Sequence, residues 1–445
     1  MKRYLYESLK KYKRMDFSSF HTPGHKCNFN VLNKLISLDF TELLLTDSLY
    51  EATGIIKKAE DDLAKLYGTQ KSLFSCGGNT LCIQAMLRLA VPNGGKILCD
   101  RTVHRSAVSA MALLGIEPIW VRRKFNKENR LFDMLNLESI KKELASNSDI
   151  KAIYITSPSY HGILQDIKSI SNECKKYCIP VLVDNAHGSH LMFLEKTLHP
   201  LEQGADLVAD SAHKTLPVLT GGAWLHVNNE KYVKKAKEAM SLFGSTSPSY
   251  PIMASMDICT DWLSSKGKSE FLKLENRVSN IKKLAKEKGF YVPIKNSDPL
   301  RITLGVWNFG ITGYEFRNYL YKFKIEPEFC DENYVVLIPT PFNSKKDCNR
   351  LKRALMNADK FYNWEENKTT KTYDFKLPKK VLSLREAIMS PSETVEIIKS
   401  KGRVAAGIVC PCPPGIPVVM PGEEIGDFEI ESLKKYGVLE IAVLK

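Results

Sequence analysis

The chain has 445 residues, 44% of them hydrophobic, and its 64 Lys and Arg residues outnumber its 50 Asp and Glu residues to give a net charge of +14. A chain of this length and composition can bury large cores, so we expect two or three lobes. No uninterrupted apolar stretch is long enough to cross a membrane, and charges are scattered through residues 1–20, where a signal peptide would be apolar. We therefore expect a cytoplasmic protein without a membrane partner.

The basic residues occur in short runs, such as Arg122–Lys127 and Lys282–Lys288, mostly with acids nearby and without interleaved aromatic residues. This pattern favours solvated helix faces and argues against a nucleic-acid partner. The eleven cysteines are dispersed, and the two close pairs, Cys174 with Cys178 and Cys410 with Cys412, lack a matching second pair or histidine cluster at zinc-binding spacing. We therefore expect reduced thiols and no bound metal. A net-positive protein repels a cationic substrate at long range, so such a substrate would need carboxylates in the pocket itself.

Residues 1–20 are expected to form an arm that packs on a partner or on the main body, because their apolar residues recur at near-helical spacing. Residues 21–255 are expected to form a large domain in which short apolar strands alternate with helices. This alternation predicts an α/β fold with a mostly parallel sheet. The expected strands are 73–76, 96–99, 118–121, 152–156, 180–183, 207–209 and 223–227, and the expected helices are 169–177 and 56–67, the latter with a C-cap at Gly68.

Long amphipathic helices over 256–263 and 271–288, followed by a strand over 300–306, indicate a second, small α/β domain over residues 256–364. The charged, polar stretch 365–381 is expected to be an exposed linker. Residues 382–445 would then form a C-terminal lobe, giving a smaller α+β C-terminal region, in which Ser392 and Glu393 precede a helix.

Chemistry-bearing residues follow the ends of successive predicted strands. Asp184 follows one apolar strand, Lys214 follows another, and a Gly-Gly turn over Cys76–Thr80 opens an apolar helix. Pyridoxal phosphate needs an amine for a Schiff base, an anion at its ring nitrogen and a helix N-terminus for its phosphate. Carboxyl ends of parallel strands meet at one sheet edge, so this order predicts a single pyridoxal phosphate site.

These residues, together with the motifs His21–Lys26, Ser245–Tyr250, Pro413–Pro417 and Pro421–Glu423, resemble the ornithine/lysine/arginine decarboxylases among the fold-type-I pyridoxal phosphate enzymes. The resemblance runs along nearly the whole chain. It implies an aspartate-aminotransferase-like fold, a homodimer with shared active sites, and decarboxylation of lysine, arginine or ornithine in polyamine-related metabolism.

The resemblance also implies a role for each site residue. Lys214 would form the Schiff base, Asp184 would pair with the ring nitrogen, and Ala186 and His104 would lie on opposite faces of the ring. Thr246 would reach the phosphate of the partner subunit. The remaining expected cofactor contacts are Gly78, Asn79, Thr80, His187, Ser211 and His213.

Three positions depart from the family pattern. Asn185 stands where an acidic residue often follows the aspartate, Cys412 where a tyrosine commonly precedes the Pro-Pro-Gly, and Gly407 at an often acidic position. The first two lie on the cofactor or substrate side of the site, so they bear on the choice of substrate and leave the Schiff-base chemistry untouched.

For decarboxylation, the α-carboxylate must stand perpendicular to the cofactor ring, and His213 or Lys214 would then return a proton to the same carbon. An aminotransferase would instead hold that carboxylate with an arginine; Arg301 is the candidate, although a solvated strand-end position is the favoured interpretation. A β-eliminating lyase, a non-catalytic decarboxylase-like regulator and a basic protein with an additional nucleic-acid role are further alternatives.

Glu423 is the expected acceptor for the distal cation of a basic substrate, with a helix-capping role as the alternative. The next candidates are Glu326, Glu328 and Asp331.

Overall fold

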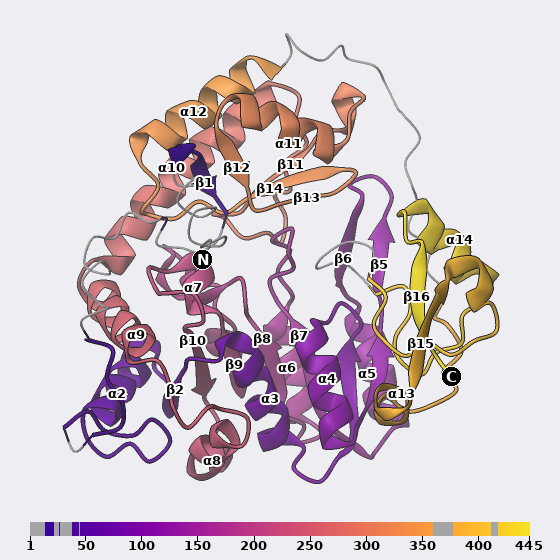
Figure 1. Cartoon of the computed structure of the whole chain (residues 1–445). Coiled ribbons are helices and arrows are strands. Elements are labelled where there is room, and N and C mark those ends of the chain that lie inside the picture. The colour runs from indigo at the N-terminus through magenta and orange to yellow at the C-terminus, as the bar shows by residue number, and fades with distance from the viewer. Residues whose placement is uncertain (1–13, 22–25, 27–37, 44, 359–376, 411–416) are drawn as a thin grey trace, which may run out of the picture.

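The computed structural model describes residues 14–21, 26, 38–43, 45–358, 377–410 and 417–445 (Figure 1). The predicted arm falls mostly outside these ranges, as do most of the predicted linker and the Cys412 position.

A seven-stranded sheet forms the centre of the large domain, in the order β2-β10-β9-β8-β7-β3-β4. Every neighbouring pair is parallel except the two made by β10, which runs antiparallel to β2 and β9. The α/β class with a mostly parallel sheet is therefore confirmed. The strands are β2 (Lys71–Ser75), β3 (Gly95–Asp100), β4 (Ile116–Val121), β7 (Ile150–Thr156), β8 (Val181–Asp184), β9 (Leu207–Asp210) and β10 (Ala223–Val227).

Both faces of this sheet are buried, which is why its strands are nearly continuous apolar runs. Leu207 and Ala209 of β9 belong to one hydrophobic cluster, whereas Val208 between them belongs to another on the opposite face. In Figure 1, α3 (Gly78–Ala90) and α4 (Arg105–Leu114) lie over the same part of the sheet. The other helices of this domain are α2 (Ile55–Tyr67), α5 (Leu137–Ser146), α6 (Ile167–Lys175), α7 (Ala212–Thr215) and α8 (Ala236–Ser241).

Gly68 caps α2 in the left-handed conformation at φ 66°, as predicted. A hairpin of β5 (Arg123–Asn126) and β6 (Leu131–Leu135) occupies much of the basic run at 122–127. Within it, Arg123 is buried and pairs with Asp100. The prediction of a solvated helix face is therefore wrong for this run, which is mostly β-strand and contains a buried arginine.

A long helical segment connects the large and small domains. It consists of α9 (Tyr250–Trp262), a π-helical turn over Leu263–Gly267, and α10 (Lys268–Glu287), so helix crosses the predicted boundary at residue 256. A three-stranded antiparallel sheet follows, in the order β11 (Ile302–Gly305), β14 (Tyr334–Leu337) and β13 (Phe329–Cys330). It is accompanied by α11 (Gly313–Lys322) and α12 (Lys345–Met356).

The short strand β1 (Ser18–Phe20) pairs in parallel with β12 (Ile325–Pro327) of the small domain. Phe20 is fully buried, and its carbonyl accepts a hydrogen bond from the Ile338 amide at 2.8 Å. The end of the predicted arm is therefore built into the small domain.

The C-terminal lobe has its own hydrophobic cluster. It contains α13 (Leu384–Met389), the antiparallel pair β15 (Ser392–Glu396) and β16 (Glu440–Leu444), and α14 (Asp427–Lys435). The predicted helix start at Ser392 and Glu393 is wrong, because these residues pair with β16. Within the described ranges, no helix combines the length and apolar character needed to cross a bilayer.

Candidate active site

A pocket of about 420 Å³ lies beside the ends of β7, β8 and β9 and the start of α3. Ten of the residues that the sequence predicts for the site line it: Gly78, Asn79, Thr80, His104, Asp184, Ala186, His187, Ser211, His213 and Lys214. Their convergence follows from the parallel sheet, which brings successive strand ends to one edge.

Lys214 lies on α7, directly after β9, and its Nζ is 3.0 Å from Nε2 of His187. Burial lowers the pKa of Lys214, and the charges of Asp184 and Glu328 oppose this shift. Burial also holds the pKa of His187 well below its ordinary value, so a neutral His187 can accept a hydrogen bond from the lysine. The result is an amine that loses its proton more readily than an exposed lysine does.

Asp184 ends β8 and is 2% exposed. Its Oδ1 accepts hydrogen bonds from Asn79 Nδ2 at 2.8 Å and from the Ala186 amide at 3.2 Å, while Tyr154 OH lies 3.3 Å from Oδ2. Burial raises the pKa of Asp184, and the nearby His104 and Lys214 oppose this shift. A cation bound next to this carboxylate would therefore be strongly stabilised.

The Gly-Gly turn forms the start of α3. Gly78 has φ 66°, a conformation that favours glycine, and its amide donates to the Gly221 carbonyl at 2.8 Å. Asn79, a predicted phosphate contact, uses its amide group on Asp184. Thr80 is exposed at the pocket wall.

The two histidines that flank the pocket are each held by a local contact. His104 is the N-cap of α4, with Nδ1 accepting from the Ser106 amide at 3.3 Å. His213 Nδ1 is 2.9 Å from the Gly222 carbonyl, so this nitrogen carries the proton and Nε2 is the other titratable position. Burial lowers the pKa of both rings.

Two predicted residues do not line the pocket. Thr246 is exposed, in a loop whose neighbours Ser245 and Ser247 line a separate depression next to the Gly-Gly turn. Glu423 is 3% exposed, and its two carboxylate oxygens each lie 2.7 Å from a guanidinium nitrogen of Arg101. Its charge is already neutralised, so we withdraw its assignment as the acceptor for the substrate cation. It does not cap a helix either, because α14 begins at Asp427.

The three remaining acidic candidates differ in their partners. Tyr321 OH donates to Glu326, and His161 Nε2 lies 2.9 Å from Asp331. Glu328 accepts from Tyr160 OH at 2.7 Å, and Tyr160 is part of the pocket wall. The Tyr160 ring also packs edge-on against His187, with 4.6 Å between ring centroids.

Residues beyond the predicted set also shape the site. Tyr154 and Tyr160 lie in or just after an apolar strand, where nothing distinguishes them in sequence from core residues. The prediction that Arg301 is solvated is wrong: it is 3% exposed, and its guanidinium donates to the His187 carbonyl at 3.0 Å. The residue is enclosed because Asp298 balances its charge, with the nearest ion-pair atoms 3.6 Å apart.

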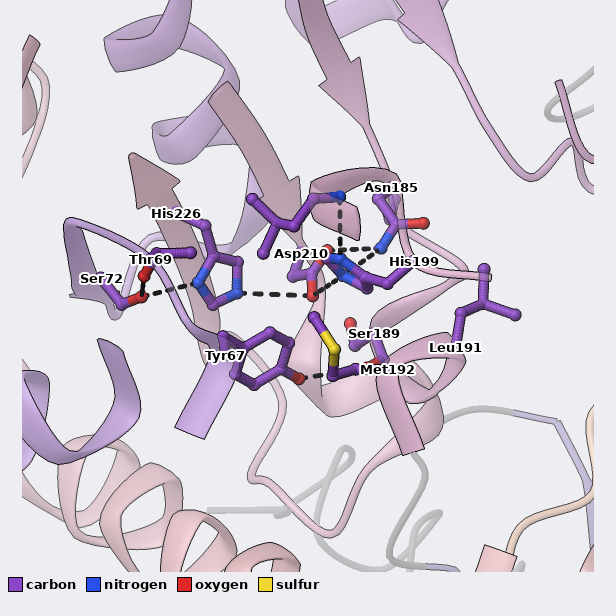
Figure 2. Close-up of polar contacts among 12 residues, drawn as sticks. Tyr67, Thr69, Ser72, Asn185, Ser189, Leu191, Met192, His199, Asp210 and His226 are labelled. Atoms are coloured by element: carbon purple, nitrogen blue, oxygen red, sulfur yellow. Dashed lines mark hydrogen bonds and ion pairs between the residues drawn. The ribbon is translucent and has the colours of Figure 1, made fainter. Parts of the chain in front are cut away.

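The contacts of Asn185 account for its departure from the family pattern. Its amide donates to Oδ1 of Asp210 at 2.6 Å within a fully buried polar cluster (Figure 2). The acidic group that the family pattern often has at residue 185 is therefore replaced by a neighbouring carboxylate, that of Asp210 at the end of β9. Gly407 is half-buried, and the space around its Cα would admit a side chain.

The major-domain model of the Orn/Lys/Arg decarboxylases matches residues 4–303, and the model of their C-terminal domain matches residues 367–437. An uncharacterised Bacillus subtilis protein, YaaO, is 32% identical over 97% of this chain and 93% of its own length. The arginine decarboxylase of Bacillus subtilis is 30% identical over the same shares. The structure of the constitutive lysine decarboxylase of Escherichia coli has a TM-score of 0.77 at 19% identity and covers 99% of this chain and 81% of its own. This structural likeness supports the fold.

Proposed function

The chain belongs to the Orn/Lys/Arg decarboxylase family of enzymes, and on that premise we propose that it removes the α-carboxyl group of a basic amino acid with pyridoxal phosphate as cofactor. The observation that carries this proposal is the convergence of Lys214 and Asp184 in one pocket, the first with a lowered pKa and the second buried. A structural role alone would not require this pair of groups.

The pocket fits the cofactor. Its volume of about 420 Å³ is in the range of small-molecule sites. Within the described chain, Asn79 Oδ1 and His187 Nδ1 are buried there without a hydrogen-bond partner, which leaves polar atoms for a ligand. Lys214 would hold the aldehyde, Asp184 the ring nitrogen, and the start of α3 with Ser211 and His213 the phosphate. When bound, the cofactor supplies an electron sink for the bond that breaks at the substrate Cα.

The residues of this chain have two tasks in the reaction. Asp184 holds positive charge at the cofactor ring, and its burial makes that attraction strong. His213 or Lys214 returns a proton to Cα; burial lowers the pKa of both groups, so the protonated form of each gives up its proton more readily than it would in water.

A basic substrate also needs an acceptor for its distal cation, and we assign this role to Glu328. Glu328 accepts a hydrogen bond from Tyr160 in the pocket wall. The Tyr160 ring packs against His187, whose Nε2 is 3.0 Å from Lys214 Nζ. Glu328 opposes the lowering of the Lys214 pKa by burial, so its charge is felt at the amine. We expect Glu328→Gln to raise KM at least about tenfold with a smaller change in kcat, because a charge-assisted contact contributes about 1.5–3 kcal/mol. Glu326→Gln is the matched control, and an equal KM increase in both variants would contradict the assignment.

An aminotransferase is the second candidate function, and the burial of Arg301 is the observation that favours it. Within the described structure, Nη1 of Arg301 has no hydrogen-bond partner, so it can receive a carboxylate. An arginine clamp of this kind would hold the α-carboxylate in the ring plane and protect it from loss.

The deciding experiment is to incubate the purified protein and pyridoxal phosphate separately with arginine, lysine and ornithine, and to identify the products by mass spectrometry. Decarboxylation gives the corresponding amine and CO2 in equal amounts, and Lys214→Ala should abolish both. A 2-oxo acid with conversion of the cofactor to its amine form would identify an aminotransferase instead. Absence of both products with all three amino acids would contradict the proposed substrate class.

We further propose that the enzyme acts in the cytoplasm, in polyamine-related metabolism, as a homodimer with composite active sites. The exposure of Thr246 supports the shared site, because a residue that contacts a partner subunit must lie at the surface of its own.

A further inference from the structure

A second buried carboxylate, Asp210, lies directly behind the proposed cofactor site. Asp184 pairs with Ala209 of the neighbouring strand, so Asp210 is the next residue along β9. Successive side chains of a strand point to opposite faces. Asp184 contacts Asn79 of α3 on one face, whereas Asp210 contacts His199, His226 and Asn185 on the other.

Asp210 is the centre of a polar cluster that is closed to water (Figure 2). Its Oδ1 accepts from Asn185, and its Oδ2 lies 3.1 Å from His199 Nε2 and 3.5 Å from His226 Nε2. Asp210, Asn185 and both histidines are 0% exposed. Burial would raise the pKa of Asp210, but His199 and His226 outweigh it, and the pKa lies below its ordinary value. Asp210 therefore retains its negative charge in the core.

The outer contacts of the cluster fix the two histidine rings. His199 Nδ1 accepts from the Leu201 amide at 3.4 Å, so its Nε2 carries the proton that faces Asp210. His226 Nδ1 is 2.8 Å from Ser72 Oγ on β2, and its ring stacks on Tyr67 with 4.3 Å between centroids. Asp210 thus links the segment after β8 to β9, β10 and β2.

The connection to the proposed site runs through Asn185, which stands between Asp184 and Ala186. The Asn185 amide N–H donates to the Ala209 carbonyl at 2.9 Å, and its side chain is held by Asp210. On the other side, Asn185 Oδ1 packs close to the Gly188 backbone, in the space that a side chain at residue 188 would fill. Asn185 is therefore fixed from both sides, and its main chain sets the positions of its two neighbours.

We propose that Asp210, acting through Asn185, is a positioning residue for Asp184 and Ala186, and so for the ring of the cofactor. This inference rests on the proposed function for its cofactor. If Asp210 served only the stability of the core, its replacement would not change the affinity for the cofactor.

The test compares variants of the full-length protein in their affinity for pyridoxal phosphate, followed by absorbance titration, and in their steady-state kinetics. Asp210→Asn removes the charge, and Asn185→Ala removes the connection but leaves Asp210 with both histidines. We expect each to weaken cofactor binding about tenfold and to lower kcat at least about tenfold, with KM within about threefold of the parent. Glu60→Gln is the matched control: Glu60 is 3% exposed and pairs with Lys237 away from the pocket, so this variant should lose stability and keep the parent affinity and kcat.

The double variant Asn185→Asp with Asp210→Asn restores a carboxylate–amide pair in reversed order. We expect it to recover at least a third of the lost kcat and the parent cofactor affinity. The inference is overturned if Asn185→Ala binds the cofactor and turns over like the parent, and this result does not depend on whether Asp210→Asn folds. If the parent protein binds no pyridoxal phosphate, the proposed function is refuted instead. If the parent binds the cofactor but does not decarboxylate, the cofactor affinities of the variants still decide the inference.

Discussion

The Arg101–Glu423 ion pair predicts that Glu423→Gln will destabilise the protein without changing substrate affinity. The two side chains are 7% and 4% exposed, and two contacts of 2.7 Å join them. Glu423 Oε2 also accepts from the Met420 amide at 2.8 Å. A glutamine can keep one oxygen acceptor, but its NH2 group would face donors, and the guanidinium would stay buried without a counter-charge. Breaking such a pair from one side costs about 3–5 kcal/mol.

The assay is thermal unfolding by calorimetry at a fixed protein concentration, together with KM for each basic amino acid. Because a chain of several lobes need not unfold in one step, the first transition is the quantity to compare. Glu423→Gln should lower its midpoint by several degrees and leave KM within twofold. The neighbouring Glu424→Gln is the control, since Glu424 is partly exposed and 3.7 Å from Lys379, a contact worth at most about 1 kcal/mol. An unchanged midpoint with a severalfold higher KM would refute this reasoning and return Glu423 to the substrate site.

Three further predictions follow from the site and its surroundings. Asp184→Ala should retain part of the bound cofactor yet lower kcat at least about 100-fold, measured by cofactor content and turnover, whereas near-parent activity would mean that another group pairs with the ring. Burial lowers the pKa of Lys282 to about 8, below its unfolded value, so the folded chain releases this proton first and stability rises with pH from about 8 to about 10.4. Relative to Lys282→Met, the parent should gain up to roughly 3 kcal/mol in free energy of unfolding over this pH range, measured by urea unfolding. Parallel stability–pH profiles of the parent and the variant would contradict the lowered pKa. Mixed and reassembled Lys214→Ala and Thr246→Arg proteins should recover about a quarter of parent activity if the sites are shared, and no recovery in verified heterodimers would count against sharing.

The sheet of the large domain could be predicted because its signals are local. Each strand is a short apolar run, and both faces are covered, so the pattern does not depend on distant partners. The positions of Asp184 and Lys214 at one edge followed from the same alternation. In contrast, the start of β15 at Ser392 carries a helix-start signal that pairing with β16 overrides.

Long-range charge pairing could not be read from the chain. The sequence predicted a solvated Arg301 and a substrate-binding Glu423, but both are buried because Asp298 and Arg101, respectively, balance their charges. Asp210 is similar, since its two histidines come from separate segments and nothing local marks them as its partners. Such groups become visible only when the fold has brought opposite charges together.

The parallel pairing of β1 with β12 also bears on how the chain is made. Ser18 leaves the ribosome roughly 300 residues before its partner Ile325, which at about 5–20 residues per second is a delay of roughly 15–60 s. During this time the edge of β1 is unpaired, and Phe20, fully buried in the finished protein, has no core to enter. The small domain is thus completed by a strand that is synthesised roughly 300 residues before its partner, and the nascent chain must keep that strand from pairing with other chains until the partner emerges.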